Sequence, residues 1–263
     1  MMRLFTDTLC AKAIRYRWLI YTFVARDLKL RYSGSALGVL WTLLNPLLFM
    51  LVYTLVFSIY FRMTMENYPV FLLSGLLPWI WFSESVQFGT SSIVAGGGYI
   101  GRTMFPAEVL PIVAILSPMM NFLYSLPILA LFIVGFHVHT GWPLLALPVV
   151  MIAQFAVSLG IVLFTATYTV FFRDLSYLIT HILMLCMFLV PIVYPLTNVP
   201  EALRPIVASN PLTVLAISYQ AIFFHNLWPD FRMLLGVAAF GIALSWFGLR
   251  VFERHKDAFA EYL

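Results

Sequence analysis

Charged side chains are scarce in this 263-residue sequence, at 10% of all residues, whereas a soluble domain carries about 25%. Hydrophobic residues make up 62% and gather in long runs, with the charges in the gaps between them. This shortage of charge excludes a water-soluble domain of useful size. The runs also lack the roughly ten-residue alternation of a membrane β-barrel, so the sequence predicts an all-α, polytopic membrane protein.

The sequence is also poor in residues that bind metals and nucleotides. Its two cysteines, Cys10 and Cys186, lie in segments too different to suggest a disulfide or a shared metal site. His137 and His139 would suit a metal only beside a third ligand, so we expect no metal site. A phosphate-binding loop needs a lysine preceded by glycine, but none of the three lysines follows a glycine. The chain lacks this route to ATP, and we do not expect an enzyme.

Six apolar runs are long enough to cross a membrane, because about 20 helical residues at roughly 1.5 Å each cover the hydrocarbon core. The predicted spans are residues 36–61, 69–95, 111–136, 143–171, 176–195 and 229–250. An even number of spans puts both termini on one side. If that side is the cytoplasm, twelve of the fifteen basic residues lie inside and only Arg62, Arg204 and Arg232 lie outside. The positive-inside rule favours this orientation.

Residues 1–35 form a basic N-terminal segment that we expect to stay in the cytoplasm. On a helical projection its side chains separate into a basic arc (Arg15, Arg26, Lys29) and an apolar arc (Ile20, Tyr21, Val24, Leu28), with Arg17 and Arg31 as exceptions. We predict a moderately amphipathic helix at the membrane interface. The transmembrane domain then covers residues 36–250, and residues 251–263 form a cytoplasmic tail.

Gly34 and Gly38 form a GxxxG motif at the entry to the first span. Such a motif permits close approach of two helices. A flexible elbow between the interface helix and the span explains it equally well, and the sequence leaves both open.

Residues 195–230 are too polar and too broken by Pro200, Pro205 and Pro211 to form another span, yet they contain apolar pieces. Apolar pieces of about 10 to 14 residues are typical of re-entrant or interfacial segments. We expect two short half-helices within residues 196–228 that dip into the outer leaflet. An ordinary interfacial loop is the alternative.

Four stretches, taken in order, resemble one family. They are RDLKLRYSGSALGVLWTLLNPLL at 26–48, GRTMFPAEVLP at 101–111, VFFRDL at 170–175 and PIVYPLTNVPEALRPIVASNPLT at 191–213. They are similar to the membrane subunits of ABC-2 type exporters that move lipid-linked polysaccharides, namely the O-antigen, capsule and teichoic acid permeases. The first and fourth stretches look most like the O-antigen type, which serves lipopolysaccharide biosynthesis.

This resemblance implies a half-transporter of the inner, or cytoplasmic, membrane. The chain would form a homodimer and rest on two cytoplasmic ABC ATPase subunits. Those partners would bind ATP and magnesium, so this chain itself would need no cofactor. The implied substrate is an undecaprenyl-linked polysaccharide, in contact with membrane lipid and with no nucleic acid involved.

In such exporters the ATPase contacts the interface helix and the first cytoplasmic loop, here residues 96–111, which we call the first loop. A simple turn is the alternative for this stretch. The resemblance implies seven ATPase-coupling residues: Arg26, Lys29, Arg31, Arg102, Phe105, Pro106 and Glu108.

A polysaccharide conduit needs flat apolar faces that stack on sugar rings, and aromatic side chains supply them. Two stripes fit this need as channel-lining residues: Trp41, Phe49, Tyr53, Phe57 and Tyr60 in the first span, and Tyr177, His181, Phe188 and Tyr194 along the fifth. Packing, or a place in the aromatic belt at the membrane interface, is the alternative for any single one of them.

Glu84 is the one acid well inside a predicted span. An intramembrane carboxylate is by default a candidate for function. No basic residue lies near it in sequence, so a structural network with Ser83, Ser85 and Gln87 and a pore-facing site both stay open.

Three other functions are alternatives to export of an O-antigen type polymer. Export of capsule or teichoic acid, or of a small lipid or drug, would keep the same topology. A membrane-embedded polyprenyl-phosphate sugar transferase would need acids or histidines clustered at the cytoplasmic edge. The candidates Asp27, Glu108 and Asp174 lie in separate segments without a repeated acidic motif, which makes the transferase the weakest of the three.

Overall fold

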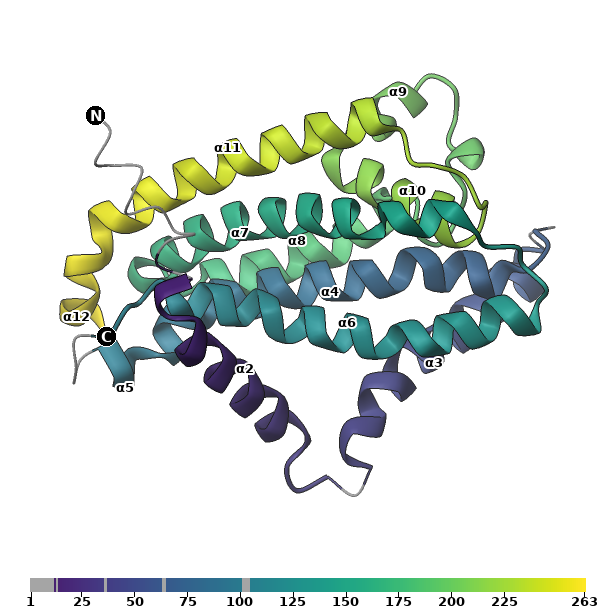
Figure 1. Cartoon of the computed structure of the whole chain (residues 1–263). Coiled ribbons are helices and arrows are strands. Elements are labelled where there is room, and N and C mark those ends of the chain that lie inside the picture. The colour runs from purple at the N-terminus through teal and green to yellow at the C-terminus, as the bar shows by residue number, and fades with distance from the viewer. Residues whose placement is uncertain (1–11, 13, 36, 63–64, 101–104) are drawn as a thin grey trace.

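The computed structural model describes residues 12, 14–35, 37–62, 65–100 and 105–263. Within these ranges all regular structure is helical (Figure 1), which confirms the all-α part of the predicted fold class. Five helical segments of the described chain are long and apolar enough to cross a membrane: Trp41–Tyr60, Tyr68–Ala95, Val109–Gly135, Trp142–Phe171 and Phe231–Ala258. They correspond to the first four and the last of the six predicted spans.

The helices follow the chain in simple order. They are α2 (Arg17–Tyr32), α3 (Trp41–Thr54), α4 (Tyr68–Ala95), α5 (Gly97–Ile100), α6 (Val109–Gly135), α7 (Leu147–Phe171), α8 (Leu175–Leu189), α9 (Arg204–Ala208), α10 (Pro211–Phe223), α11 (Phe231–His255) and α12 (Phe259–Tyr262). A π-helical turn at Leu55–Tyr60 lengthens α3. Short 3-10 turns lie at Gly38–Leu40, Trp142–Ala146, Leu196–Asn198 and Lys256–Ala258.

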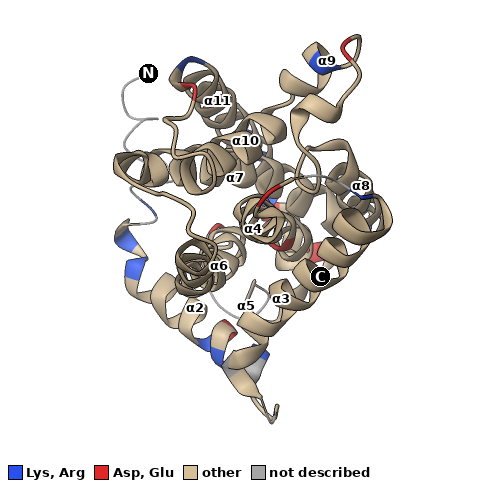
Figure 2. Ribbon diagram, turned by 90° about the vertical axis from the view of Figure 1, so that its right-hand side faces the viewer, with Lys and Arg blue, Asp and Glu red and all other residues tan. Residues whose placement is uncertain are grey.

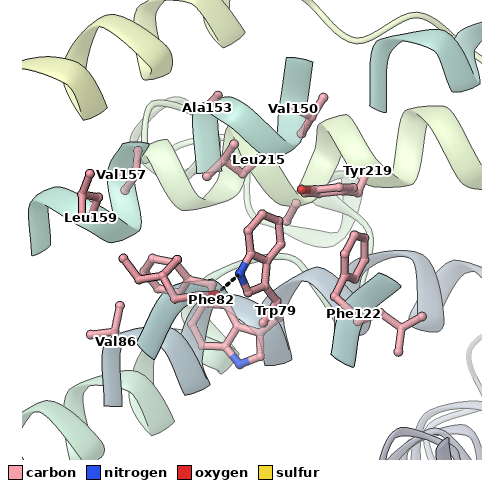
Figure 3. Packing of buried hydrophobic residues seen from close by; sticks show 14 of the residues in the cluster. Trp79, Phe82, Val86, Phe122, Val150, Ala153, Val157, Leu159, Leu215 and Tyr219 are labelled. Atoms are coloured by element: carbon pink, nitrogen blue, oxygen red, sulfur yellow. Dashed lines mark hydrogen bonds between the residues drawn. The ribbon is translucent and has the colours of Figure 1, made fainter. Parts of the chain in front are cut away.

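Helix α4 is the centre of the bundle. It contacts α3, α6, α7, α8 and α10, while α11 packs along α7. Figure 3 shows Trp79 and Phe82 of α4 lying among side chains of α6, α7 and α10. Between α7 and α11 the backbones touch, because a Cβ on Gly160 would lie only 2.6 Å from Cγ of Leu244. Close packing of this kind holds helices together in lipid.

The two ends of the bundle differ in what they carry. One end holds the C-terminus, α5, α12 and the start of α2, and the other holds α9 and the loops around it (Figure 1). Helices α2 and α3 diverge from the bundle as the two arms of a V (Figure 1). In the view along the bundle, Lys and Arg are visible on α2, on α9 and at the start of α11 (Figure 2).

The fifth predicted span, residues 176–195, is only partly helical. Helix α8 has 15 residues and ends at Leu189, a length of about 22 Å that is shorter than the hydrocarbon core of about 30 Å. The cause is Pro191, because a residue before proline avoids the helical region. Val190 accordingly has an extended ψ of 135°. The predicted helix was therefore too long at its C-terminal end.

A helix, α2, lies where the interface helix was predicted, and its packed face follows the projection except at Tyr21. Ile20 is buried and Phe23 and Val24 are half-buried, whereas Tyr21, predicted on the apolar arc, is 68% exposed. Arg31 lies on the packed side. Contacts with α6 explain this choice of face.

The segment between α2 and α3 is an elbow. Gly34 and Gly38 have positive φ values of +79° and +48°, and no described atom lies within 4 Å of a Cβ built on either one. Close helix approach is therefore absent at these positions, and of the two interpretations of GxxxG the structure supports the elbow.

Residues 195–230 contain two α-helices, the number predicted, and a 3-10 turn at Leu196–Asn198. Asn210 caps α10, since its side chain accepts a hydrogen bond from the backbone N–H of Leu212 at 2.9 Å, and Pro211 occupies the first helical position. Helix α10 contacts α4, α7 and α11 and has most of its residues buried. Helix α9 has five residues, none of them buried.

Candidate functional site

The first loop is joined to α2 by an aromatic cluster. The ring of Phe23 in α2 lies 5.4 Å from Tyr99 and 5.5 Å from Phe105, and the two loop rings are 5.7 Å apart. The guanidinium of Arg26 donates a hydrogen bond to the Tyr99 hydroxyl and lies 4.8 Å from the Phe23 ring centroid. A displacement of the loop would therefore act directly on α2.

Glu108, at the end of the first loop, is bound within the chain. It is 6% exposed, and Nζ of Lys12 donates a hydrogen bond of 2.8 Å to its Oε1. Lys12 also donates to Oε1 of Glu253 at 3.0 Å, and Nζ of Lys256 lies 3.8 Å from the Glu108 oxygen. This cluster joins the N-terminal segment, the loop and the end of α11.

The charged groups of this cluster shift one another's pKa values. Burial by itself raises the pKa of the Glu108 carboxyl, but the hydrogen bond from Lys12 and the nearby positive charges hold that pKa below its ordinary value. Burial by itself lowers the pKa of Lys12, and its bonds to Glu108 and Glu253 outweigh this, so the pKa of Lys12 is raised. Both groups are therefore charged at neutral pH.

The structure brings only some of the seven predicted ATPase-coupling residues together at the first loop. Arg26, Phe105 and Glu108 meet other segments around the first loop, with Pro106 in the same turn, whereas Lys29 is exposed, Arg31 points to α4, and Arg102 lies outside the described residues. Sequence reasoning missed Lys12, Phe23 and Glu253. No local pattern could have found them, because their partners lie far away along the chain.

Glu84 of α4 forms an ion pair with Arg31 of α2. Nη1 of Arg31 lies 3.0 Å from Oε2 of Glu84, and its Nε lies 3.1 Å from Asp27. The same guanidinium lies 4.2 Å from the ring centroid of Phe88. Glu84 therefore belongs to a network, but its partner is a residue of α2. The predicted partners Ser83 and Ser85 instead donate to backbone carbonyls of their own helix.

A stripe of rings follows α3. Successive centroids from Phe49 to Tyr53 to Phe57 are each 6.3 Å apart, and Phe61, which sequence reasoning did not include, continues the stripe at 5.6 Å. Phe49 is 52% exposed, whereas Tyr53 and Phe57 are half-buried against the bundle. Trp41 and Tyr60 are exposed at the two ends of the segment.

Helix α8 presents the second predicted stripe. None of its 15 residues, all of them described, is buried, and Tyr177, His181 and Phe188 are exposed. The Tyr53 hydroxyl lies 3.6 Å from Sδ of Met187, which brings α3 and α8 together. Tyr194 lies beyond the helix, where its hydroxyl donates to the Phe188 carbonyl at 2.7 Å.

The two stripes meet at a cavity of about 1060 Å³ at the end of the bundle opposite α12. Aromatic residues and polar residues both line it: Phe57, Phe61, Tyr194 and Phe224 on the one hand, Arg62, Glu66, Thr197 and Asn198 on the other. Aromatic faces beside hydrogen-bonding groups suit sugar rings, which have apolar faces and polar edges.

The sequence matches the ABC-2 type transporter family over residues 19–224. The chain belongs to this family. The resemblance identified in the four stretches is thereby confirmed, and the match covers α3 to α10 and nearly all of α2.

Curated relatives of this ABC-2 chain include permeases of O-antigen export systems. The O-antigen export system permease protein RfbA of Myxococcus xanthus is 39% identical over 249 residues, which cover 94% of this chain and 96% of the relative. The protein of the same name from Klebsiella pneumoniae is 32% identical over 247 residues, covering 93% and 95%. The polysialic acid transport protein KpsM of Escherichia coli is 24% identical over 239 residues, covering 89% and 92%.

Proposed function

We propose that this ABC-2 chain is the transmembrane subunit of an ATP-driven exporter that moves an undecaprenyl-linked polysaccharide of the O-antigen type across the cytoplasmic membrane. The observation that carries the proposal is the similarity to O-antigen permeases along almost the whole chain, at 39% and 32% identity. The capsule-type relative is similar over a comparable length at only 24%, so an O-antigen type polymer is favoured over a capsule polymer.

The proposed topology has six crossings with both termini in the cytoplasm, the fifth crossing being α8 together with residues 190–195. Non-helical backbone is tolerated in a membrane where protein satisfies its polar groups. Val190, Pro191, Ile192 and Val193 are buried. The carbonyl of Pro191 accepts a hydrogen bond from Gln220 at 2.9 Å, and that of Val193 accepts one from Tyr68 at 2.8 Å.

A homodimer would enclose the aromatic stripes. In the single chain the α3 segment is mostly exposed and α8 has no buried residue, so both helices present unpartnered apolar surface. Placing two copies with α3 and α8 facing each other puts rings on opposite walls of one path. Export of a drug or small lipid would not require such a continuous aromatic path.

ATP would act through two partner ATPase subunits that contact the first loop. Their closure would push the loop, and the contacts of Tyr99 and Phe105 with Phe23 would carry the movement into α2. The elbow at Gly34 and Gly38 would then turn it into a movement of α3. In this scheme the pair of Arg31 and Glu84 limits how far α2 can move away from α4.

Export by the purified chain, reconstituted with its ATPase and a lipid-linked polysaccharide, tests the proposal. We expect ATP-dependent movement of the polymer. Replacing Phe105 with alanine should lower export per ATP hydrolysed about fivefold or more, as expected when coupling between two sites is lost. Phe136→Ala, at the opposite end of the bundle, is the matched control and should leave this ratio unchanged. Sugar transfer by the chain alone, without an ATPase, would overturn the proposal.

A further inference from the structure

Residues 253–263, which we call the tail from here on, comprise the last three residues of α11 and the segment after His255, which folds back against the end of the bundle. After α11 a tight turn leads into α12 (Figure 1). The rings of Phe252 and Phe259 pack at 5.3 Å, and both side chains are fully buried. Tyr262 meets the ring of Phe171 in α7 at 4.9 Å. The tail is therefore a packed element of the structure.

Two contacts join the tail to the first loop. Leu263 lies over the loop's beginning, since a Cβ built on Gly97 would be 3.3 Å from the Cβ of Leu263. At the other end of the loop, Lys12 bridges Glu108 to Glu253 of the tail, at 2.8 Å and 3.0 Å. The tail thus touches the loop on both sides of the segment that would face an ATPase.

Separating the tail from the loop is unfavourable. The side chain of Glu108 is 8% exposed, and both of its cationic neighbours, Lys12 and Lys256, are tied to the tail or belong to it. Withdrawing the tail would take Lys256 away from Glu108 and Glu253 away from Lys12, so the desolvated carboxylate would keep Lys12 as its one cationic neighbour among the described residues. Loop and tail are thus favoured to move together.

We propose that the tail is a positioning element for the first loop, which it holds through Lys12, Glu108 and Glu253 and through Leu263 on Gly97, so that loop and tail move as one body during transport. This inference rests on the proposed contact between the first loop and an ATPase. The tail gives the movement of the first loop a second route into the bundle beside α2, because the tail is continuous with α11. The residues concerned position the loop and do not touch the polymer.

A disulfide between Gly97→Cys and Leu263→Cys tests whether loop and tail stay together. The separation of 3.3 Å is close to the roughly 3.5 to 4.5 Å between Cβ atoms of a disulfide. The background would carry Cys10→Ser and Cys186→Ser. We expect the bond to form in the assembled transporter and export to continue unchanged. Absence of the bond, or export that stops and returns on reduction, would overturn the proposal.

Substitutions in the cluster test whether the contact matters for coupling. Glu253→Gln should leave the amount of membrane-inserted chain unchanged and lower export per ATP hydrolysed by about fivefold or more. Lys12→Met should lower both, because it also leaves the buried Glu108 carboxylate without its nearest cation. Lys12→Arg should restore the ratio because it keeps the charge. Glu261→Gln, an exposed acid of the same tail, is the matched control. If Glu253→Gln behaves like Glu261→Gln, or lowers only the amount of chain, the tail has no positioning role.

Phe105→Ala separates failure of this inference from failure of the proposed function. If Phe105→Ala uncouples export and Glu253→Gln does not, the first loop contacts the ATPase and the tail inference alone is wrong. If neither variant changes the ratio, the loop is not the contact and the inference fails with it. Because both cysteines of the disulfide would belong to this chain, we expect the bond to form with or without the ATPase, so that it reports the geometry separately in both cases.

Discussion

Arg31 contacts the carboxylates of Asp27 and Glu84 and the ring of Phe88, and its pair with Glu84 joins α2 to α4. Taking a charge out of water is costly, and the attraction between the partners repays this only when the geometry is good. The contacts to Glu84 at 3.0 Å and Asp27 at 3.1 Å meet that condition. Removing one partner is therefore worse than neutralising both.

We predict that Arg31→Met destabilises the chain by about 1 to 3 kcal/mol, because it leaves the Glu84 carboxylate without its donor. Glu84→Gln should cost less, since the amide oxygen still accepts from Arg31. The double variant should be more stable than Arg31→Met alone. Thermal unfolding of the purified chain in lipid nanodiscs measures all three.

Arg232→Met, at the opposite end of the bundle, is the control for this series. If Arg31→Met lowers the melting temperature no more than Arg232→Met does, the pair with Glu84 contributes nothing to stability. A double variant as unstable as the sum of its parts would likewise contradict the argument, because interacting residues are not additive.

The sequence could single out Glu84 but could not find its partner. An acid within an apolar run is conspicuous in any window, whereas Arg31 lies 53 residues away. Lys12 and Glu108 are 96 residues apart. Such pairs are decided by how α2 packs on the bundle, which depends on side chains of several helices at once and leaves no local pattern.

At the scale of helices, length and apolarity predicted the five helices of the described chain that are long enough to cross a membrane, because a membrane requires long apolar helices. The ends of the helices were less well predicted. A single proline, Pro191, stops α8 six residues before the predicted end of the span at 195. The packed face of α2 was predicted correctly at Ile20, Val24 and Leu28 but not at Tyr21, because contact with α6 also decides which side chains pack.

The elbow depends on backbone conformation and not on packing. Gly34 has φ +79° with no described atom within 4 Å of a Cβ position, so an alanine there would meet only the strain of the left-handed region, about 1 to 2 kcal/mol. We predict that Gly34→Ala lowers stability or straightens the elbow, and that Gly34→Asn costs less because asparagine tolerates this region. Thermal unfolding in nanodiscs measures the change.

Gly236→Ala is the matched control for the elbow. Gly236 likewise has no described atom within 4 Å of a Cβ position, but it lies inside α11 without a positive φ. Alanine should be neutral or stabilising there, by up to about 1 kcal/mol, because it favours helix. Equal stability of the Gly34 and Gly236 variants would show that the elbow does not need glycine.

At the scale of the whole molecule, burial is unevenly distributed. Helix α4 is surrounded by other helices, whereas α3 and α8 lie at the edge of the bundle with aromatic residues exposed. The sequence predicted both stripes because regular aromatic spacing is visible in a single helix. It could not tell which rings also pack inward, as Tyr53 and Phe57 do.

This difference decides which residue tests the export path. Alanine at Tyr53 or Phe57 would disturb packing as well as any path, so Phe49, at 52% exposure, is the cleaner choice. We predict that Phe49→Ala leaves insertion and stability unchanged and lowers the export rate about fivefold or more, as expected from losing about 1 kcal/mol or more of stacking on sugar rings. Phe240→Ala in α11, where the residue is 49% exposed, should leave insertion, stability and the export rate unchanged. Equal export by the two variants would mean that the α3 stripe faces lipid or a partner subunit and does not line the path of the polymer.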